Sequence, residues 1–328
     1  MKKTTVEQLF EWFDETTETV SSHLDDVYLE GLIDVLETIF YEEPHEDFDD
    51  ILKKKLQTAL ERLKKINYTD KDLKKALQLV VLKGMKGSVQ EQHLMTPESV
   101  GLIVAYLANR LLENKEEICL FDPAVGTGNM LFTVMEQLPQ KKTTYASEVD
   151  PTLIQLAHSS ANLLKKEVEF FHQDSLAPLL LDPVDLVVAD LPVGYYPDDV
   201  RAAEYELKAE EGHSYAHHLF IEQSLKHTKE TGYLIFVIPD FLFTSDQAEQ
   251  LNRFLKEHTH MVGLLRLPES MFKSKQNVKG ILVLQKKGVE TEGPKQPLLV
   301  QLPSLKNHHA MADILGQMNR WFQTYERN

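Results

Sequence analysis

The sequence predicts an α/β protein, in which a doubly wound sheet of about seven strands with helices on both faces follows an all-helical N-terminal domain. Three observations support this prediction. Amphipathic segments without strand signals fill residues 1–88. In residues 89–328, short apolar runs alternate with helical segments, as in a sheet that is buried on both faces. A glycine-rich turn joins the first of these runs to a helix.

The N-terminal domain, residues 1–88, is expected to consist of four helices. Apolar side chains recur at helical spacing over residues 4–20, 24–41, 46–66 and 70–83. Thr69 and Asp70 are suited to cap the fourth of these helices. After a polar link, Thr96-Pro97-Glu98 is expected to open a helix that runs to about Leu112, with the proline in its first turn.

The second domain, residues 89–328, is expected to alternate strands and helices. The predicted strands cover residues 118–122, 143–148, 168–171, 184–189, 233–238, 261–266 and 280–285. The predicted helices cover residues 129–138, 151–165, 215–229 and 244–257, with a short one at 268–272. Residues 288–300 contain several Gly and Pro and indicate a loop. A last helix over about 309–325 is expected to pack back on the body.

Charge is distributed unevenly along a chain of net charge −16. Residues 1–50 hold 16 Asp/Glu and 2 Lys/Arg, whereas residues 51–88 hold 11 Lys/Arg and 3 Asp/Glu. We expect these two segments to pair with each other. The remainder is acidic, and since proteins that grip nucleic acid alone usually have a basic face, unaided binding to duplex DNA is not expected.

The single cysteine, Cys119, falls in a predicted buried strand. Disulfides and thiolate metal sites are therefore not expected, and no other metal site is predicted. One buried cysteine favours the reducing cytoplasm. No apolar run is long enough to span a bilayer, so no membrane association is predicted.

The turn at residues 122–130, Asp-Pro-Ala-Val-Gly-Thr-Gly-Asn-Met, is the central motif. Gly126 and Gly128 allow backbone conformations that a β-carbon resists and a close approach to a ligand. The following helix offers free N–H groups at its start. Because the third glycine of the dinucleotide fingerprint is absent, an ordinary tight βα turn remains an alternative.

Acidic side chains follow the next two predicted strands. Glu148 ends the second strand, where a carboxylate accepts hydrogen bonds from ribose hydroxyls in nucleotide-binding sheets. Asp150 precedes a proline and is suited to cap the next helix. Asp174 follows the third strand and is placed to accept from an adenine amino group, with Leu176 against the ring. A solvated strand end for Glu148 and a plain turn for Asp174 remain open.

The loop after the fourth strand holds Asp190, Pro192, Tyr195 and Tyr196, where an open α/β sheet places reacting groups. A side-chain oxygen and a nearby carbonyl can hold a planar amino group and direct its lone pair at an electrophile. The two tyrosines are candidates for stacking on a flat substrate. A rigid loop packed by aromatic rings is the alternative.

Together these motifs resemble the class I S-adenosylmethionine-dependent methyltransferases, and more narrowly the N6-adenine DNA methylase family, which includes the modification subunits of type I restriction systems. The YtxK-like proteins carry a similar loop after the fourth strand. The resemblance extends over nearly all of residues 90–287 and implies a Rossmann-like sheet. The matching segments are 93–97, 122–131, 148–151, Asp174, 213–221, 238–239, 267–272 and 279–282.

The resemblance also implies roles for individual residues. Those implied to contact S-adenosyl-L-methionine are Thr96, Asp122, Pro123, Ala124, Gly126, Thr127, Gly128, Asn129, Glu148, Val149, Asp174, Ser175, Leu176 and Asp190. At the catalytic position the resemblance implies Asp190, with the Leu191 carbonyl as second acceptor. Pro192, which would make the loop rigid, and Tyr195 and Tyr196, as stacking surfaces, are catalytic candidates from the residues themselves. The reaction expected is direct methyl transfer to an exocyclic amino group of nucleic acid, by resemblance adenine N6 of DNA.

Two departures from the family pattern leave other acceptors open. Leu191 and Val193 stand where the family has a proline and an aromatic residue, and Val193 cannot stack on an extruded base. Only 41 residues follow residue 287, too few for a DNA-reading domain, so DNA is expected to be reached through a separate specificity partner. The helical domain is a candidate for protein contacts. The alternatives are a methyltransferase for RNA, protein or a small molecule, and a non-catalytic cofactor-binding protein.

Overall fold

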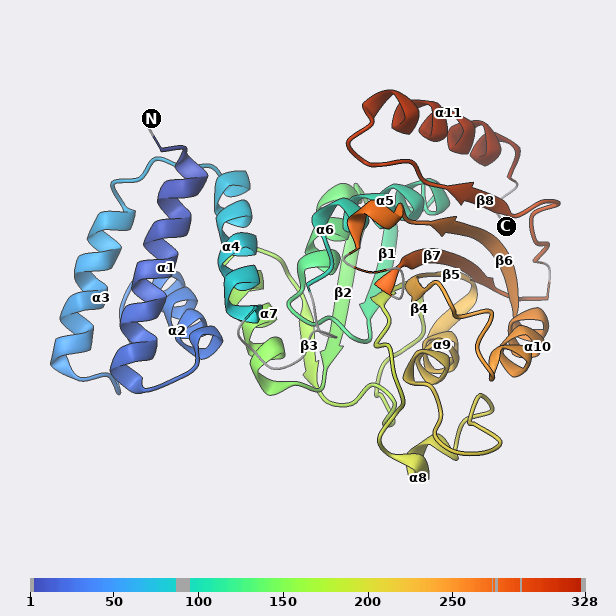
Figure 1. Cartoon of the computed structure of the whole chain (residues 1–328), viewed down its shortest axis with the longest axis horizontal. Coiled ribbons are helices and arrows are strands. Elements are labelled where there is room, and N and C mark those ends of the chain that lie inside the picture. The colour runs from blue at the N-terminus through green and yellow to red at the C-terminus, as the bar shows by residue number, and fades with distance from the viewer. Residues whose placement is uncertain (1–2, 87–94, 273, 275–276, 290, 326–328) are drawn as a thin grey trace.

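The computed structural model describes residues 3–86, 95–272, 274, 277–289 and 291–325. A helical N-terminal region is followed by an α/β domain (Figure 1). The expected boundary at residue 88 lies outside the described residues, as do His93 and Leu94 of the motif that precedes the glycine turn.

Four helices form the N-terminal region: α1 (Thr5–Leu24), α2 (Tyr28–Tyr41), α3 (Asp50–Leu63) and α4 (Asp70–Met85). Leucine, valine and aromatic side chains from all four helices make one core, which includes the fully buried Phe13. The expected cap of α4 is present, since the Thr69 hydroxyl accepts from the Asp72 N–H and the Asp72 carboxylate accepts from the Thr69 N–H.

The α/β domain contains an eight-stranded sheet with the order β3-β2-β1-β4-β5-β7-β6-β8. The strands are β1 (Glu117–Asp122), β2 (Lys141–Glu148), β3 (Glu169–His172), β4 (Val184–Asp190), β5 (Thr228–Pro239), β6 (Thr259–Arg266), β7 (Lys279–Lys286) and β8 (Leu298–Gln301). Strand β7 pairs antiparallel with β5 and β6, and the other pairs are parallel. The strand order reverses between β1 and β4, and ligands bind beside such a point.

Helices cover both faces of the sheet. One apolar cluster joins strand residues to α5 (Glu98–Leu111), α6 (Asn129–Gln137), α7 (Pro151–Leu163) and α11 (His308–Thr324). A second joins the opposite face to α9 (Ala216–Lys226) and α10 (Ala248–His258), with the short α8 (Asp199–Ala202) nearby. Neighbouring residues of β4 alternate between the clusters, with Val187 in the second and Val188 in the first, as expected for a strand buried on both faces.

The seven predicted strands are confirmed, and the structure adds an eighth. The prediction of a loop over residues 288–300 was wrong at its end, because Leu298–Gln301 forms β8 beside β6. Leu298 is buried there, and the short β8 becomes the edge strand on this side of the sheet. The predicted helix start at Thr96-Pro97-Glu98 is shifted by one position, since Pro97 lies just before α5 rather than inside its first turn.

The helical region packs on the α/β domain chiefly through α2, which contacts α7. Helix α4 lies at the same side of the α/β domain (Figure 1). Leu156 of α7 is fully buried in the core of the helical region. Lys74 of α4 is also buried and forms ion pairs with Glu98 at 3.3 Å and with Glu136 at 2.6 Å. Within the described residues, no helix is both long and apolar enough to cross a bilayer.

Candidate functional site

The glycine turn begins where β1 ends. Gly126 and Gly128 both have positive φ angles, of 53° and 80°, in the region that favours glycine. A β-carbon on Gly126 would meet nothing within 4 Å, so this side of the turn is open. A β-carbon on Gly128 would lie 2.4 Å from the Phe132 ring, so Gly128 is required by packing. Gly126 is therefore the glycine that allows a ligand to approach the backbone.

Glu148 lies at the end of β2 and contacts the glycine turn directly. Its Oε2 accepts a hydrogen bond of 2.9 Å from the Gly126 N–H, and its Oε1 accepts from the N–H groups of Val149 and Asp150. Three donors thus fix the carboxylate beside the open side of Gly126. Asp150 caps α7 by accepting from Thr152 and Leu153, as its sequence context suggested.

Asp174 follows β3 and holds a second carboxylate at the same edge of the sheet. Its Oδ1 accepts from the Leu176 N–H at 2.9 Å, and its Oδ2 accepts from the Tyr196 hydroxyl. Ser175 donates to the Pro123 carbonyl at 2.6 Å and ties this loop to the glycine turn. The Leu176 side chain is buried in the core.

Asp190 ends β4 and is held from two sides. Its Oδ2 accepts from the Thr96 hydroxyl at 2.8 Å, and its Oδ1 lies 2.5 Å from the Lys279 ammonium nitrogen. The Asp190 side chain is 15% exposed to solvent. Thr96 in turn accepts through its carbonyl from Asn129 Nδ2 at 2.6 Å. Thr96 therefore bridges the start of α6 and the end of β4.

Three carboxyl groups converge at the ends of β1, β2 and β4. Asp122 is only 1% exposed, and burial raises its pKa well above the usual range, with further contributions from the negative charges of Glu148 and Asp190. The Ala124 N–H, which donates to Asp122, opposes this shift. A cation bound beside these groups would favour the ionised form of Asp122 and offset the repulsion among the carboxyl groups, so this edge of the sheet suits a cationic ligand.

The two tyrosines of the β4 loop have different surroundings. Tyr196 is buried and positions Asp174, so its ring is not available for stacking. Tyr195 is 58% exposed and stacks on Tyr215, with ring centroids 4.9 Å apart and planes 12° apart. The stack continues from Tyr215 to His217 at 5.0 Å. Of the two rings, only that of Tyr195 is presented outward.

Two buried histidines support this aromatic stack. His217 and His218 are fully buried, and among the described residues the Pro192 carbonyl is near the His217 ring without forming a well-aligned hydrogen bond. Burial lowers the pKa of His217 to about 3, helped by the neighbouring His218 and opposed by the Pro192 carbonyl. Burial lowers the pKa of His218 to about 4. Both rings are neutral at physiological pH. His217 stacks on Tyr215, and His218 contacts the Tyr215 ring with its edge.

The structure brings most of the predicted site residues to one edge of the sheet and separates a few. Val149 is exposed, and the side chains of Leu176 and Leu191 are buried. Lys279 and Tyr215 lie within the family-like segments 279–282 and 213–221, but the sequence predicts no role for either residue. Lys279 could have been expected at the site from its place at the start of β7. An antiparallel strand begins at the edge of the sheet where its parallel neighbours end.

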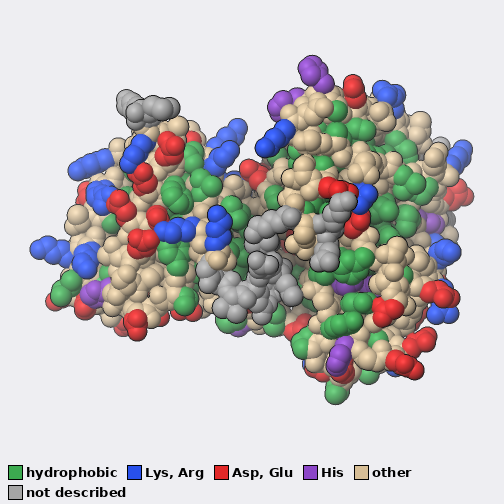
Figure 2. Space-filling model, in the orientation of Figure 1, with side chains coloured by type: hydrophobic (Ala, Val, Ile, Leu, Met, Phe, Trp, Pro, Cys, Tyr) green, Lys and Arg blue, Asp and Glu red, His purple; other side chains and the backbone are tan. Residues whose placement is uncertain are grey.

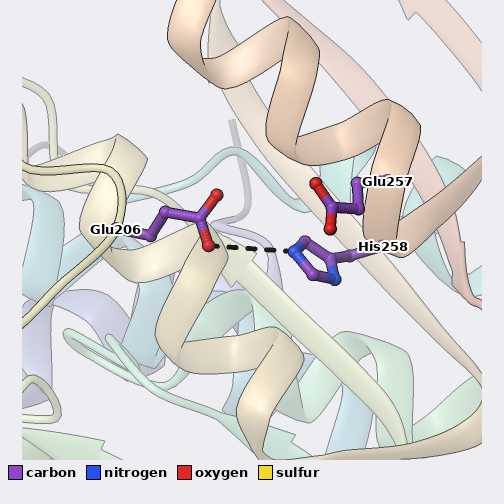
Figure 3. Close-up of side chains that lie close together, drawn as sticks. All are labelled: Glu206, Glu257 and His258. Atoms are coloured by element: carbon purple, nitrogen blue, oxygen red, sulfur yellow. Dashed lines mark ion pairs between the residues drawn. The ribbon is translucent and has the colours of Figure 1, made fainter.

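A separate group of possible metal ligands lies on the surface. Glu206, Glu257 and His258 each bring one ligand atom within 4.8 Å of the others (Figure 3). His258 Nε2 lies 3.8 Å from Glu206, and both glutamates are exposed. This group has the character of an ordinary surface ion pair.

Comparison with known proteins shows the family. A profile described as N-6 DNA Methylase matches residues 86–318, and one described as YtxK N-terminal helical domain matches residues 7–85. The chain belongs to the N-6 DNA methylase family. The YtxK protein of Bacillus subtilis is 47% identical to this methylase-family chain over 331 residues, covering 98% of the chain and 99% of YtxK.

Solved structures agree with this methylase-family assignment. A Listeria monocytogenes protein assigned to the class I S-adenosylmethionine-dependent methyltransferases is 40% identical, with a TM-score of 0.90 and coverage of 97% of this chain and 99% of that protein. The type I restriction-modification methyltransferase subunit of Streptococcus thermophilus shares the fold, with a TM-score of 0.64 at 14% identity. It is matched over 98% of this chain and 74% of that subunit.

The cofactor of this methylase-family protein is S-adenosyl-L-methionine. The residues present fit that group. The open side of Gly126 gives a ligand access to the backbone, and Glu148 presents carboxylate oxygens beside it. The converging carboxyl groups of Asp122, Glu148 and Asp190 suit the positive charge of a sulfonium. The protein is an S-adenosylmethionine-dependent methyltransferase by family and fold.

Proposed function

We propose that this protein methylates an exocyclic amino nitrogen of nucleic acid, with adenine N6 of DNA as the preferred acceptor. The observation that carries the proposal is the placement of Asp190. Its carboxylate lies at the end of β4, is held by Thr96 beside the cofactor turn, and is followed directly by the Leu191 carbonyl. The family assignment supports adenine as the acceptor.

The residues of this edge suggest a direct transfer. S-adenosylmethionine, when bound, supplies an electrophilic methyl group. Asp190 and the Leu191 carbonyl would each accept a hydrogen bond from the amino group, directing the nitrogen lone pair toward the cofactor turn. As positive charge develops on that nitrogen, the Asp190 carboxylate stabilises it. Cys119, the sole cysteine, lies within β1 rather than in this loop, so a covalent cysteine intermediate is not part of the proposal.

Tyr195 is proposed as the surface on which the acceptor base stacks. Val193 offers no flat face, but Tyr195 lies two residues later with an exposed ring backed by Tyr215. Stacking of a base on an aromatic side chain contributes about 1–3 kcal/mol and tolerates any base. The Tyr195 ring would thus replace the family's aromatic residue.

Access to DNA is proposed to require a separate partner. The net charge is −16, and Figure 2 shows Lys and Arg side chains gathered mainly over the helical N-terminal part of the visible face, among acidic ones. A surface of mixed sign does not favour unaided binding to phosphate. We propose that the helical region, residues 1–88, contacts that partner. In this proposal the methyltransferase domain comprises residues 89–328, and the protein acts in the cytoplasm.

A second candidate function is methyl transfer to RNA, protein or a small molecule. The valine at position 193 and the acidic surface favour this candidate over a self-sufficient DNA methylase. It shares the same cofactor site and the same role for Asp190. The two candidate functions therefore differ only in which acceptor molecule carries the transferred methyl group.

The test follows radiolabelled methyl groups from S-adenosylmethionine into unmethylated DNA, RNA and protein fractions. We expect label in adenine N6 of DNA, lost in Asp190→Ala and retained in Asp182→Ala. Asp182 is a matched control, because it is an exposed aspartate next to the opposite end of β4. Label confined to RNA or protein would support the second candidate. No label in any fraction, with the cofactor product bound, would contradict both.

A further inference from the structure

Gln78 of the helical region is the first member of a chain of hydrogen bonds that ends at Asp190. Gln78 Nε2 donates to Asn129 Oδ1 at 2.8 Å, and Asn129 Nδ2 donates to the Thr96 carbonyl at 2.6 Å. The Thr96 hydroxyl donates to Asp190 Oδ2 at 2.8 Å. Three links thus connect α4 to the end of β4 through the start of α6.

The direction of these hydrogen bonds is fixed by chemistry. A carbonyl only accepts, so Asn129 must turn its amide nitrogen toward Thr96. The Asn129 oxygen must then face Gln78, which can satisfy it only by presenting its own amide nitrogen. Asn129 is 7% exposed, so its oxygen would lack a partner without Gln78, and a buried polar group without a partner is costly.

The position of Gln78 is itself fixed by the helix turn before it. Lys74 lies four residues earlier on α4, and these positions share a helix face. Its ammonium group contacts Glu98 at the start of α5, and Glu136 and Thr133 on α6. The buried lysine therefore holds α4 against α5, which Thr96 precedes by two residues, and against α6, which begins at Asn129.

We propose that Gln78 is a positioning residue of the cofactor site, which makes the helical region part of the catalytic unit. By holding Asn129, Gln78 fixes the Thr96 carbonyl and so the aim of the Thr96 hydroxyl at Asp190. This inference rests on the proposed function for the role of Asp190, but its effect on cofactor binding does not depend on the acceptor.

The test is the affinity of the full chain for S-adenosylhomocysteine, measured by calorimetry. Gln78→Met keeps the length of the side chain and removes its donor, and we expect binding about five- to tenfold weaker. Gln57→Met is the matched control, because Gln57 is an exposed glutamine of α3. We expect wild-type affinity for this control. The melting temperature of each variant is measured as a check that the variant is folded.

A second background distinguishes positioning from a merely structural contact. Thr96→Val removes the last hydrogen bond of the series, from the Thr96 hydroxyl to Asp190. In this background, Gln78→Met should weaken cofactor-product binding by less than about twofold. Equal effects of Gln78→Met in both backgrounds would overturn the proposal, as would wild-type affinity in Gln78→Met. If Gln78→Met does not fold, the same binding measurement is made on Gln78→Glu. Its ionised carboxylate has the same size but cannot donate to Asn129, so the same loss of affinity is expected. Failure of methyl transfer to DNA with these results intact would count only against the proposed acceptor.

Discussion

The ammonium nitrogen of Lys279 lies 2.5 Å from Oδ1 of Asp190 and joins the start of the antiparallel strand β7 to the end of the parallel strand β4. The Thr96 hydroxyl holds the other oxygen of the same carboxylate. Asp190 is thus oriented from both sides before any acceptor arrives. An orientation set in advance lowers the cost of reaching the reactive geometry.

Replacing Lys279 should therefore impair the reaction more than cofactor binding. In Lys279→Met, Asp190 loses its ion pair and one of its two anchors, and we expect methyl transfer to fall about 10- to 100-fold. Affinity for S-adenosylhomocysteine should change little. Lys279→Arg, which keeps the charge, should retain more activity. Equal losses in activity and cofactor affinity would mean that Lys279 serves the cofactor site instead.

Glu148 should be required for the response to the cofactor product. S-adenosylhomocysteine at 100 times its Kd stabilises a folded protein by about 2.7 kcal/mol, which corresponds to a rise of about 5 °C in the melting temperature. We expect Glu148→Ala to abolish this rise, because the carboxylate beside Gly126 is lost. Glu169→Ala, at an exposed position on β3, should respond like the wild type. A full rise in Glu148→Ala would contradict the assigned role.

The exposed ring of Tyr195 should determine how well the acceptor is used. Tyr195→Ala removes the proposed stacking surface, and kcat/KM for the acceptor should fall by about 5- to 100-fold. Tyr195→Phe keeps a flat ring on Tyr215 and should act like the wild type. Cofactor affinity should be unchanged in both variants. An active Tyr195→Ala would show that the acceptor does not stack there.

The buried histidines predict a loss of stability in mild acid. The folded protein holds His217 and His218 neutral, with pKa values lowered to about 3 and 4, whereas an unfolded histidine has a pKa of about 6.5. The unfolded chain therefore binds more protons below pH 6.5. This contribution to the stability is complete above about pH 6.5 and is lost progressively as the pH falls toward the folded values.

Urea denaturation at pH 7.5 and pH 5 measures this effect. Each histidine should lower the free energy of unfolding by about 2 kcal/mol at pH 5. In His217→Phe, the loss between the two pH values should be smaller by about that amount. An identical loss in the variant and the wild type would mean that His217 is protonated in the folded state.

Most of the fold could be predicted from the sequence, because its signals are local. Continuous apolar runs indicated the seven strands, and Thr69 indicated the start of α4. The sequence did not predict β8, because Leu298, Leu299 and Val300 follow a proline in a stretch that already holds two glycines and another proline. Only pairing with β6 makes these residues a strand. Tertiary pairing decided that segment rather than local propensity.

The candidate site was predicted in part. Motifs singled out Thr96, Glu148, Asp174 and Asp190 as site candidates, but they did not reveal that Thr96 donates to Asp190. Nor could spacing show which tyrosine faces outward, since Tyr195 and Tyr196 are adjacent and their burial depends on Asp174 and Tyr215. Contacts between distant segments, such as that of Lys279 with Asp190, follow from strand order and direction.

Strand β8 has a consequence for how the molecule associates with copies of itself. Without it, the backbone of β6 from Gly263 to Arg266 would present unpaired N–H and C=O groups to solvent, next to the buried Leu265. Such a border recruits strands from other molecules and promotes aggregation. With β8 added, the sheet ends instead on a strand of four residues, which offers a neighbouring molecule a shorter border to extend than the eight-residue β6 would.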